Sequence, residues 1–146
     1  MRTFTSHSPE ETRKIGRDFA DKVSSGVIIL SGDLGSGKTI FVQGFARGLG
    51  IKEKIISPTY VLIKQYKISR SKILTSEIDV FYHVDLYRLE KEVDLENLGL
   101  QELFDYPKNL IIIEWGEKIK KLPQNSIHIS FKSKEQEREI KIDSPS

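Results

Sequence analysis

The residues with the clearest chemical meaning form one glycine-rich segment, Gly32-Asp33-Leu34-Gly35-Ser36-Gly37-Lys38-Thr39. This segment matches G-x-x-x-x-G-K-S/T, the P-loop that binds nucleotide phosphates. Glycines let successive backbone N–H groups turn toward the phosphates, and the helix that follows directs its positive end at them. We expect Lys38 to reach the β- and γ-phosphates and the Thr39 hydroxyl to ligate Mg²⁺. A plain glycine-rich turn would not require a Lys-Thr pair at this position.

The elements expected around this segment are a strand before it and a helix after it. Residues 27–30 are a continuous apolar run, as in a strand buried on both faces. Apolar residues at positions 42, 45, 46 and 49 predict a helix over residues 40–49. A dinucleotide-binding fingerprint is excluded, because a third glycine would have to stand where the chain has Ile40.

Two acidic residues follow predicted strands and are candidates for a metal site. Asp85 follows residues 80–84, and Glu114 follows the apolar run 110–113. Residues at the carboxyl ends of strands in an open α/β sheet face the crevice where ligands bind. A carboxylate there is also often a surface or capping group, so the prediction depends on its combination with the loop. Thr39, Asp85 and Glu114 form the predicted metal group, with ordering of the attacking water as an alternative role for either acid.

The remaining periodicities predict an α/β fold. Ser8 and Glu11 are placed as the N-cap and capping-box partner of a helix over residues 9–23. The other expected elements are strands over residues 59–66 and 80–84, a helix over residues 95–104, an insertion at residues 67–79 and an antiparallel hairpin that turns near residues 134–136. The chain is therefore predicted to form a P-loop NTPase-type mixed β-sheet flanked by helices, with a C-terminal antiparallel hairpin.

Length and composition predict one domain that spans residues 1–146. The net charge is 23 − 21 = +2, which excludes neither nucleic acid nor acidic partners. The lack of cysteine excludes disulfides, thiolate zinc sites and iron–sulfur clusters. No apolar run approaches the roughly 18 residues of a membrane span, and the first residues lack the apolar stretch of a signal peptide. We expect a cytoplasmic protein with no membrane contact.

The motifs that the sequence lacks limit which nucleotide the protein is expected to bind and which reaction it is expected to catalyse. The guanine-specific segments N/T-K-x-D and D-x-x-G are absent from the sequence, so ATP is the expected nucleotide. A small-molecule P-loop kinase is the main alternative to an ATPase, with residues 64–72 as a candidate lid, but nothing indicates an acceptor site. A non-hydrolysing adaptor that uses bound ATP as a switch is a second alternative. Direct RNA binding through the basic residues 64–72 is a third.

Four motifs in order carry a family resemblance: the glycine-rich loop, Ser57-Pro58-Thr59-Tyr60, His83-Val84-Asp85-Leu86-Tyr87-Arg88-Leu89 and Ile113-Glu114-Trp115. Over roughly residues 8–122 the chain resembles the TsaE (YjeE) family. Members are bacterial ATPases required for threonylcarbamoylation of the adenosine next to the anticodon in certain tRNAs. They act with TsaB and with TsaD, which performs the transfer. The resemblance implies slow ATP hydrolysis that these partners stimulate, and contact with tRNA only through the complex.

The resemblance also implies roles for individual residues. It implies that the nucleotide is held by Asp33, Leu34, Gly35, Ser36, Gly37, Lys38 and Thr39, and Mg²⁺ by Thr39, Asp85 and Glu114. The implied catalytic group is Lys38, Thr59, Asp85 and Glu114. In this group Thr59 acts as a switch residue that senses the γ-phosphate. Thr12 and Arg138 are candidates for contacts with the adenine.

Three other residues keep alternative interpretations. Trp115 packs at the nucleotide site, at a partner surface or in the core. His83 is expected to be a strand residue hydrogen-bonded near Asp85, with an acid–base role as the alternative. Arg88 contacts a phosphate or a partner, or it forms an ordinary ion pair.

Overall fold

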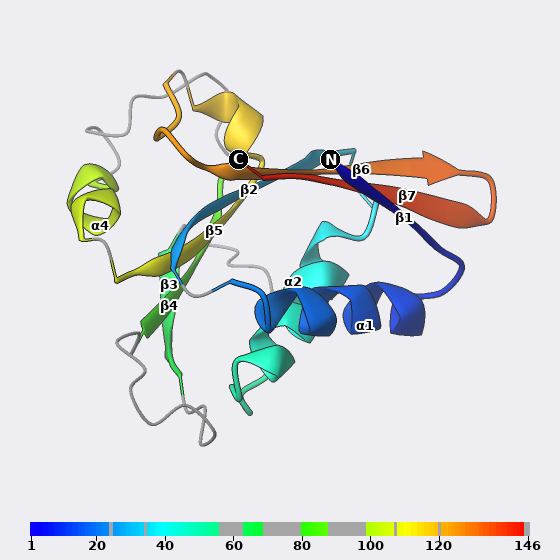
Figure 1. Cartoon of the computed structure of the whole chain (residues 1–146), viewed down its shortest axis with the longest axis horizontal. Helices are drawn as coiled ribbons and strands as arrows, with labels where there is room; N and C mark the ends of the chain where they lie inside the picture. Colours follow the sequence, from blue (N-terminus) through cyan, green and yellow to red (C-terminus); the bar gives the residue numbers. More distant parts are fainter. Residues whose placement is uncertain are drawn as a thin grey trace.

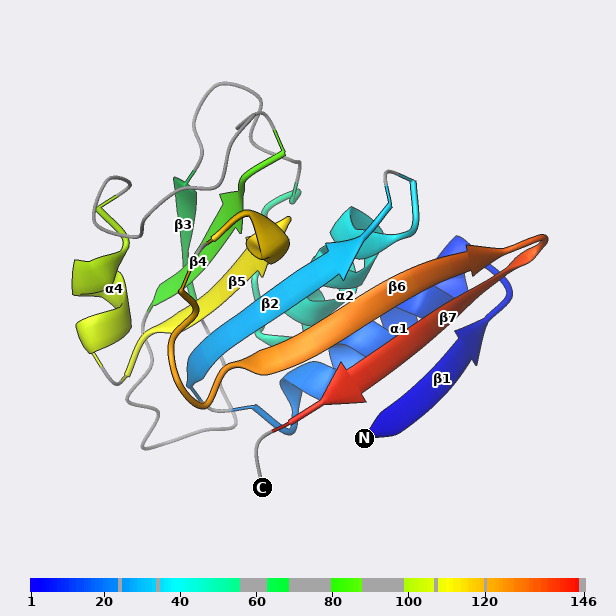
Figure 2. The ribbon, with the colours of Figure 1, turned by 90° about the horizontal axis from the view of Figure 1, so that it is seen from above.

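One β-sheet runs through the computed structural model, which describes residues 1–23, 25–33, 35–55, 63–68, 80–87, 99–106, 108–119 and 121–144. In this part of the chain the strands are β1 (Arg2–Ser6), β2 (Gly26–Gly32), β3 (Ile63–Lys67), β4 (Val80–Asp85), β5 (Leu110–Glu114), β6 (Ile127–Lys134) and β7 (Glu137–Asp143). They lie in the order β1-β7-β6-β2-β5-β4-β3 (Figure 2).

The sheet is mixed, with a parallel centre and antiparallel pairs toward both edges. Strands β6, β2, β5 and β4 run parallel to one another. Strand β7 is antiparallel to both of its neighbours, and β3 is antiparallel to β4. The carboxyl ends of β2, β5 and β4 therefore meet at one edge of the sheet. The predicted α/β fold with a mixed sheet and a C-terminal hairpin is confirmed.

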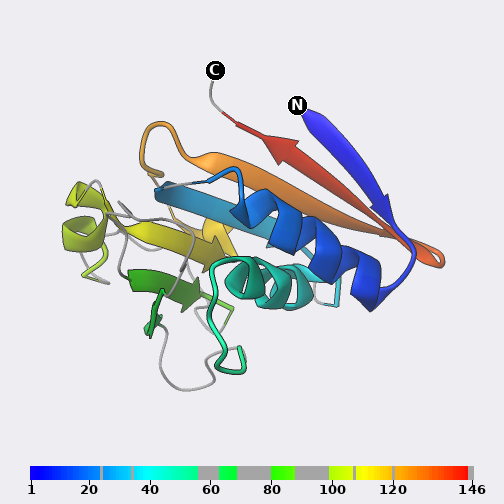
Figure 3. The same ribbon diagram turned by 60° about the horizontal axis from the view of Figure 1, so that its bottom comes forward.

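Two long helices, α1 (Pro9–Ala20) and α2 (Lys38–Gly48), lie side by side on one face of the sheet (Figures 1 and 3). Glycines permit this close approach. A Cβ built on Gly44 would lie 2.0 Å from the Arg13 carbonyl oxygen, and one on Gly16 would lie 2.3 Å from that of Phe41. Larger residues at these two positions would push the helices apart, so the spacing of α1 from α2 depends on them.

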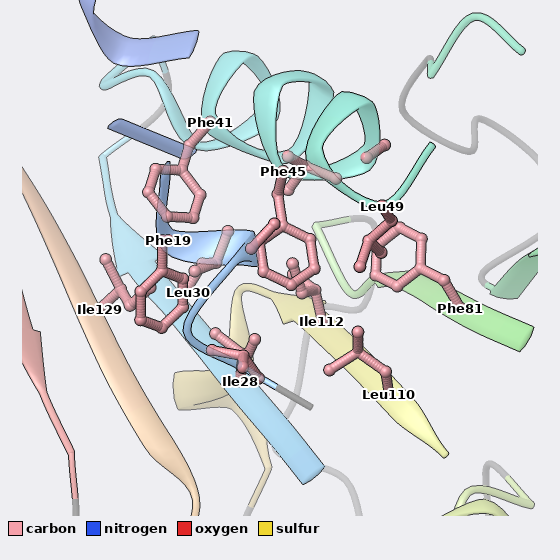
Figure 4. Close-up of a cluster of buried hydrophobic side chains, with 14 of the residues drawn as sticks. Phe19, Ile28, Leu30, Phe41, Phe45, Leu49, Phe81, Leu110, Ile112 and Ile129 are labelled. Atoms are coloured by element: carbon pink, nitrogen blue, oxygen red, sulfur yellow. The ribbon is translucent and has the colours of Figure 1, made fainter. Parts of the chain in front are cut away.

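The larger hydrophobic core lies between the sheet and these two helices (Figure 4). The ring centroid of Phe19 lies 6.1 Å from that of Phe41 and 6.0 Å from that of Phe45, which lies 5.7 Å from Phe81. Successive residues of β2 alternate between this core and a smaller one, which contains Ile29. Parts of α4 (Gln101–Asp105) and the chain around the 3₁₀ helix η1 (Gly116–Lys118) pack on the smaller core.

The start of α1 confirms one predicted contact and corrects another. Ser8 is the N-cap, and its Oγ accepts a hydrogen bond from the Glu11 N–H at 3.1 Å. The predicted capping box would pair the Glu11 carboxylate with the Ser8 N–H, but its Oε2 accepts instead from the His7 N–H at 2.5 Å. The chain turns between β1 and α1, and this turn presents the earlier amide to Glu11.

Helix boundaries differ from the predicted ones. Helix α1 ends at Ala20, three residues before the predicted end. Within the described part of the helix predicted over residues 95–104, α4 starts after Gly99 with its φ of 72°. Residues 88–98 lie outside the described residues. The positive φ of the glycine does not fit a continuous helix, so α4 begins beyond it.

Strand β1 is absent from the sequence-based prediction, and two other predicted segments are only partly described. Phe4 is the only apolar residue of β1, so its pairing with β7 depends on the folded sheet rather than on its own pattern. The strand predicted over residues 59–66 is described from Ile63 onward. The insertion expected at residues 67–79 is described only at positions 67 and 68.

Two predictions concern the chain as a whole. Among the described residues, no helix combines the length and the apolar character needed to cross a bilayer. The assignment of residues 1–146 to a single domain stays a prediction.

Candidate nucleotide site

The glycine-rich segment lies between β2 and α2, the order that a phosphate-binding loop requires. Gly35 and Gly37 have φ values of 78° and 103°, a left-handed conformation that other residues rarely adopt. No described residue has an atom within 4 Å of the position that a Cβ of Gly35 would take. Gly37 is the N-cap of α2 and has no side chain to occupy the first amides of this helix. These amides are therefore suited to bind an anion.

Lys38, the first residue of α2, is turned back onto the loop. Only 5% of the residue is exposed, and its Nζ donates to the carbonyl oxygens of Gly32 at 2.5 Å and Asp33 at 2.9 Å. Nζ also lies 4.1 Å from the centroid of the Trp115 ring. Burial lowers the pKa of the Lys38 ammonium, and the nearby Glu114 carboxylate opposes this shift. A phosphate oxygen would be a stronger acceptor for Nζ than these carbonyls.

A chain of hydrogen bonds joins the loop to the end of β5. Thr39 Oγ1 donates to Glu114 Oε1 at 2.9 Å. His83 Nε2 lies 2.5 Å from Glu114 Oε2. His83 has no exposed surface and Glu114 is 2% exposed, so a buried carboxylate has a polar contact on each oxygen. The sequence predicts that His83 is hydrogen-bonded near Asp85, whereas its hydrogen bond is to Glu114 on the next strand.

Asp85 lies beside Glu114 because the register of β4 and β5 pairs the two residues. Asp85 Oδ1 accepts a hydrogen bond from the Tyr87 N–H at 2.9 Å. Burial raises the pKa of the Asp85 carboxyl, the Tyr87 N–H opposes this, and the charge of Glu114 adds to the increase. Two buried acids thus lie at neighbouring strand ends, where a cation would reduce their repulsion.

These residues fit Mg²⁺. Hydroxyl and carboxylate oxygens are ligands that this ion prefers, and Thr39, Asp85 and Glu114 supply them. Within the described ranges, no three His, Asp or Glu side chains form a metal-binding group by themselves. Mg²⁺ at this site would therefore take part of its octahedral shell from Thr39, water and phosphate oxygens.

A cavity of about 240 Å³ opens beside the loop. Its walls include Gly35 and Gly37 from the loop, Thr12 from α1 and Arg138 from β7. Thr12 is 2% exposed, and its hydroxyl shares a hydrogen bond of 2.7 Å with Ser6 Oγ. The structure thus brings Thr12 and Arg138, the two candidates for adenine contacts, to one cavity next to the P-loop. The junction between β1 and α1 also lines this cavity, and no sequence motif signals it.

Trp115 follows Glu114 and lies against the loop lysine. Its φ of 64° is left-handed, and its backbone N–H donates to the Leu30 carbonyl oxygen at 3.0 Å, which ties the turn to β2. The ring lies against Lys38 Nζ and its centroid is 5.2 Å from that of Tyr87. The ring also packs against the smaller core, so two of the three interpretations left open by the sequence, a core contact and a position beside the loop, apply together.

The predicted site residues divide into those that converge and those that lie outside the described residues. Leu34, Thr59 and Arg88 belong to the second group. The described loop residues Asp33, Gly35, Ser36 and Gly37 lie next to Lys38 and Thr39, at the edge where Asp85 and Glu114 end their strands. Ser36 is 1% exposed, with Oγ 3.5 Å from Lys38 Nζ.

Comparison with known proteins identifies relatives over most of this fold. A family model described as "Threonylcarbamoyl adenosine biosynthesis protein TsaE" matches residues 6–140. A Bacillus subtilis (strain 168) protein named "tRNA threonylcarbamoyladenosine biosynthesis protein TsaE" is 40% identical over 136 residues, which cover 91% of this chain and 79% of that protein. A protein of the same name from Treponema pallidum (strain Nichols) is 36% identical over 129 residues, covering 87% and 88%.

A solved structure shares the fold as well. The crystal structure of Bacillus subtilis YdiB matches with a TM-score of 0.76 and 32% sequence identity. The match covers 99% of this chain and 86% of that one. Sequence and structure therefore point to the same group of proteins.

Proposed function

This chain belongs to the TsaE family, and on that premise we propose that it is an ATP- and Mg²⁺-dependent ATPase that supports tRNA threonylcarbamoyladenosine biosynthesis. Its relatives carry the name of that pathway. The partners expected from the resemblance are TsaB and TsaD, with tRNA contacted through their complex. We place this activity in the cytoplasm.

The observation that carries the proposal is the 2.9 Å hydrogen bond from Thr39 Oγ1 to Glu114 Oε1. It joins the first turn after the P-loop to the acid at the end of β5, as a site for a nucleotide and its metal requires. A hydroxyl oxygen that donates its hydrogen to a carboxylate can still ligate a cation. A glycine-rich turn with a purely structural role would have no need of this link.

The described residues of the proposed site have separate roles. The first amides of α2 and the Lys38 ammonium hold the phosphates, and Thr39, Asp85 and Glu114 hold Mg²⁺ directly or through its waters. The ion supplies positive charge where negative charge develops on the phosphates during transfer. In this proposal the cavity beside Thr12 and Arg138 receives the base, which is supported by its position next to Gly35 and Gly37.

Hydrolysis of ATP by purified variants tests the proposal. Lys38→Ala is expected to lower kcat by roughly 10²-fold or more, because it removes a preorganised charge from the transferred phosphate. Glu114→Gln is expected to bind nucleotide and to lose hydrolysis. Phosphate release and calorimetric binding of ATP measure the two effects.

Matched substitutions at exposed positions outside the proposed site serve as controls. Lys54→Ala and Glu102→Gln change the same residue types at exposed positions and should leave kcat unchanged. Full hydrolysis by the Lys38→Ala protein would show that the site is assigned wrongly.

A further inference from the structure

His83 is a buried polar residue that the proposed phosphate and metal contacts leave unused. It lies on β4 two residues before Asp85, and none of its surface is exposed. Its Nε2 lies 2.5 Å from Glu114 Oε2. Its Nδ1 is buried and has no hydrogen-bond partner among the described residues. The imidazole thus makes one polar contact in the described structure, and that contact is with the acid of the candidate site.

The direction of this hydrogen bond follows from the chemistry of the two groups. An ionised carboxylate can only accept hydrogen bonds, so the hydrogen between the two atoms belongs to His83 Nε2. In the neutral imidazole Nδ1 then carries only a lone pair. An ionised Glu114, as the proposed metal site has it, therefore implies the Nε2–H tautomer, with Nε2 as the donor.

The sheet explains why this contact forms. Side chains alternate along a strand, so His83 and Asp85 point to the same face of β4. In the parallel register His83 lies opposite Ile112 and Asp85 lies opposite Glu114. Ile112 belongs to the core beneath α2, so His83 is on the α2 side of the sheet. From there its Nε2 reaches one oxygen of Glu114, while the Thr39 hydroxyl reaches the other.

The two oxygens of Glu114 therefore have different partners. Oε2 is held by the buried His83, and Oε1 accepts from the Thr39 hydroxyl. A carboxylate held at one oxygen cannot rotate freely about its last bond, so the direction of the other oxygen is fixed too. An apolar side chain at position 83 would fill the same space and leave no unpaired Nδ1. What the imidazole adds at this position is the Nε2–H donor.

We propose that His83 is a positioning residue that holds the Glu114 carboxylate through Nε2–H and so directs Oε1 toward Thr39 and Mg²⁺. The proposal rests on the proposed function, because it assigns Glu114 to the metal. His83 itself contacts neither nucleotide nor metal. Groups that orient metal ligands in this way typically change metal affinity or activity by about 10- to 100-fold when they are removed.

Two amide substitutions distinguish the effect of the Nε2–H donor from the effect of the volume that the His83 side chain fills. His83→Gln places an amide N–H near the position of Nε2, whereas the shorter His83→Asn places it near Nδ1, out of reach of Glu114. We expect His83→Gln to keep most of the wild-type kcat and His83→Asn to lose about 10- to 100-fold. Binding of Mg²⁺-free ADP should stay within about twofold of wild type in both, since the loop is untouched, while the gain in ADP affinity on adding Mg²⁺ should shrink only in His83→Asn.

The outcomes decide the proposal. Equal losses in the two variants would overturn it, because the imidazole would then be needed for its shape and not for its Nε2–H. Wild-type behaviour of His83→Asn would overturn it as well. Thermal unfolding of each variant is recorded alongside the kinetic measurements.

A measurement on the wild-type protein covers the case in which a variant fails to fold. Long-range ¹H–¹⁵N correlation spectra of the intact chain distinguish the two imidazole tautomers. A hydrogen on Nε2 of His83 supports the proposal, and a hydrogen on Nδ1 with a bare Nε2 contradicts it. The tautomer and the Mg²⁺ dependence of ADP binding can both be measured even if the wild-type protein hydrolyses no ATP. A lack of hydrolysis would contradict the proposed function and not the positioning role of His83.

Discussion

Asp85 and Glu114 are two buried acids placed in register at the ends of adjacent strands. Without a cation this arrangement is unfavourable, since burial and the charge of Glu114 both raise the pKa of Asp85. Such a cost is typical of residues arranged for binding or catalysis rather than for stability. At the scale of single residues, the site is therefore a place where function and stability conflict.

The raised pKa of Asp85 gives a prediction with a definite sign. The folded chain holds this proton more tightly than the unfolded chain, so the resulting stabilisation is complete below the usual pKa of 3.8 and is lost as pH rises through the raised value. Without Mg²⁺ and nucleotide, Asp85→Asn should therefore increase the free energy of unfolding more at about pH 7 than at about pH 4. Urea unfolding at both pH values measures this difference.

Asp143→Asn is the matched control, because Asp143 is an exposed acid at the end of β7. It should not reproduce the pH-dependent gain. If Asp85→Asn changed the free energy of unfolding equally at both pH values, folding would not raise the pKa of Asp85.

At the scale of elements, the junction between β1 and α1 has two roles. It starts a helix, through the Ser8 cap and the contact between Glu11 and the His7 amide. It also lines the cavity next to the P-loop, where Ser6 bonds to Thr12. The geometry of the cavity therefore depends on a helix N-terminus that lies far from the glycine-rich segment in sequence.

Removal of the cap should weaken this junction. Ser8→Ala is expected to lower the free energy of unfolding by about 1 kcal/mol, because the Glu11 N–H loses its acceptor. Ser8→Asp, which keeps a good N-cap, should retain most of the stability. Denaturant unfolding of the two variants checks this, and equal stability of Ser8→Ala and wild type would mean that the cap contributes nothing.

At the scale of the molecule, three adjacent parallel strands position the residues of the site. The carboxyl ends of β2, β5 and β4 bring the loop, Glu114 and Asp85 to one edge, while their other ends lie far from it. Catalysis of phosphoryl transfer depends mainly on positioning and on neutralisation of charge. A single chain that holds ATP with these groups alone is expected to hydrolyse it slowly.

Partners should therefore accelerate the reaction. We expect TsaB and TsaD together to raise kcat for ATP hydrolysis by about tenfold or more, since one added preorganised group contributes roughly 10²–10³ in kcat. The measurement is phosphate release with and without the two proteins, with Lys38→Ala as the control for contaminating activity. The same rate in both conditions would contradict this expectation. A reconstituted modification assay with a non-hydrolysable ATP analogue then asks whether threonylcarbamoyl transfer needs the hydrolysis.

Much of this arrangement could be predicted from local sequence patterns. The loop, the strand before it and the helix after it follow from glycine spacing and apolar periodicity, and the strand-end positions of Asp85 and Glu114 follow from the runs before them. Features that depend on register or on distant segments could not be predicted. The contact between His83 and Glu114 requires the alignment of β4 with β5, and β1 requires β7 as its neighbour. The role of Thr59 stays a prediction, because it lies outside the described residues.

The pairing of β1 with β7 has a consequence for protein synthesis. One wall of the cavity comes from Ser6 and Thr12, and another from Arg138, which the ribosome adds to the chain much later. Strand β7 also holds β1 in place through residues up to Ile142. A nascent chain that has already produced the complete P-loop therefore still lacks this pocket, and a ligand that fills it can select only chains that have been made at least as far as β7.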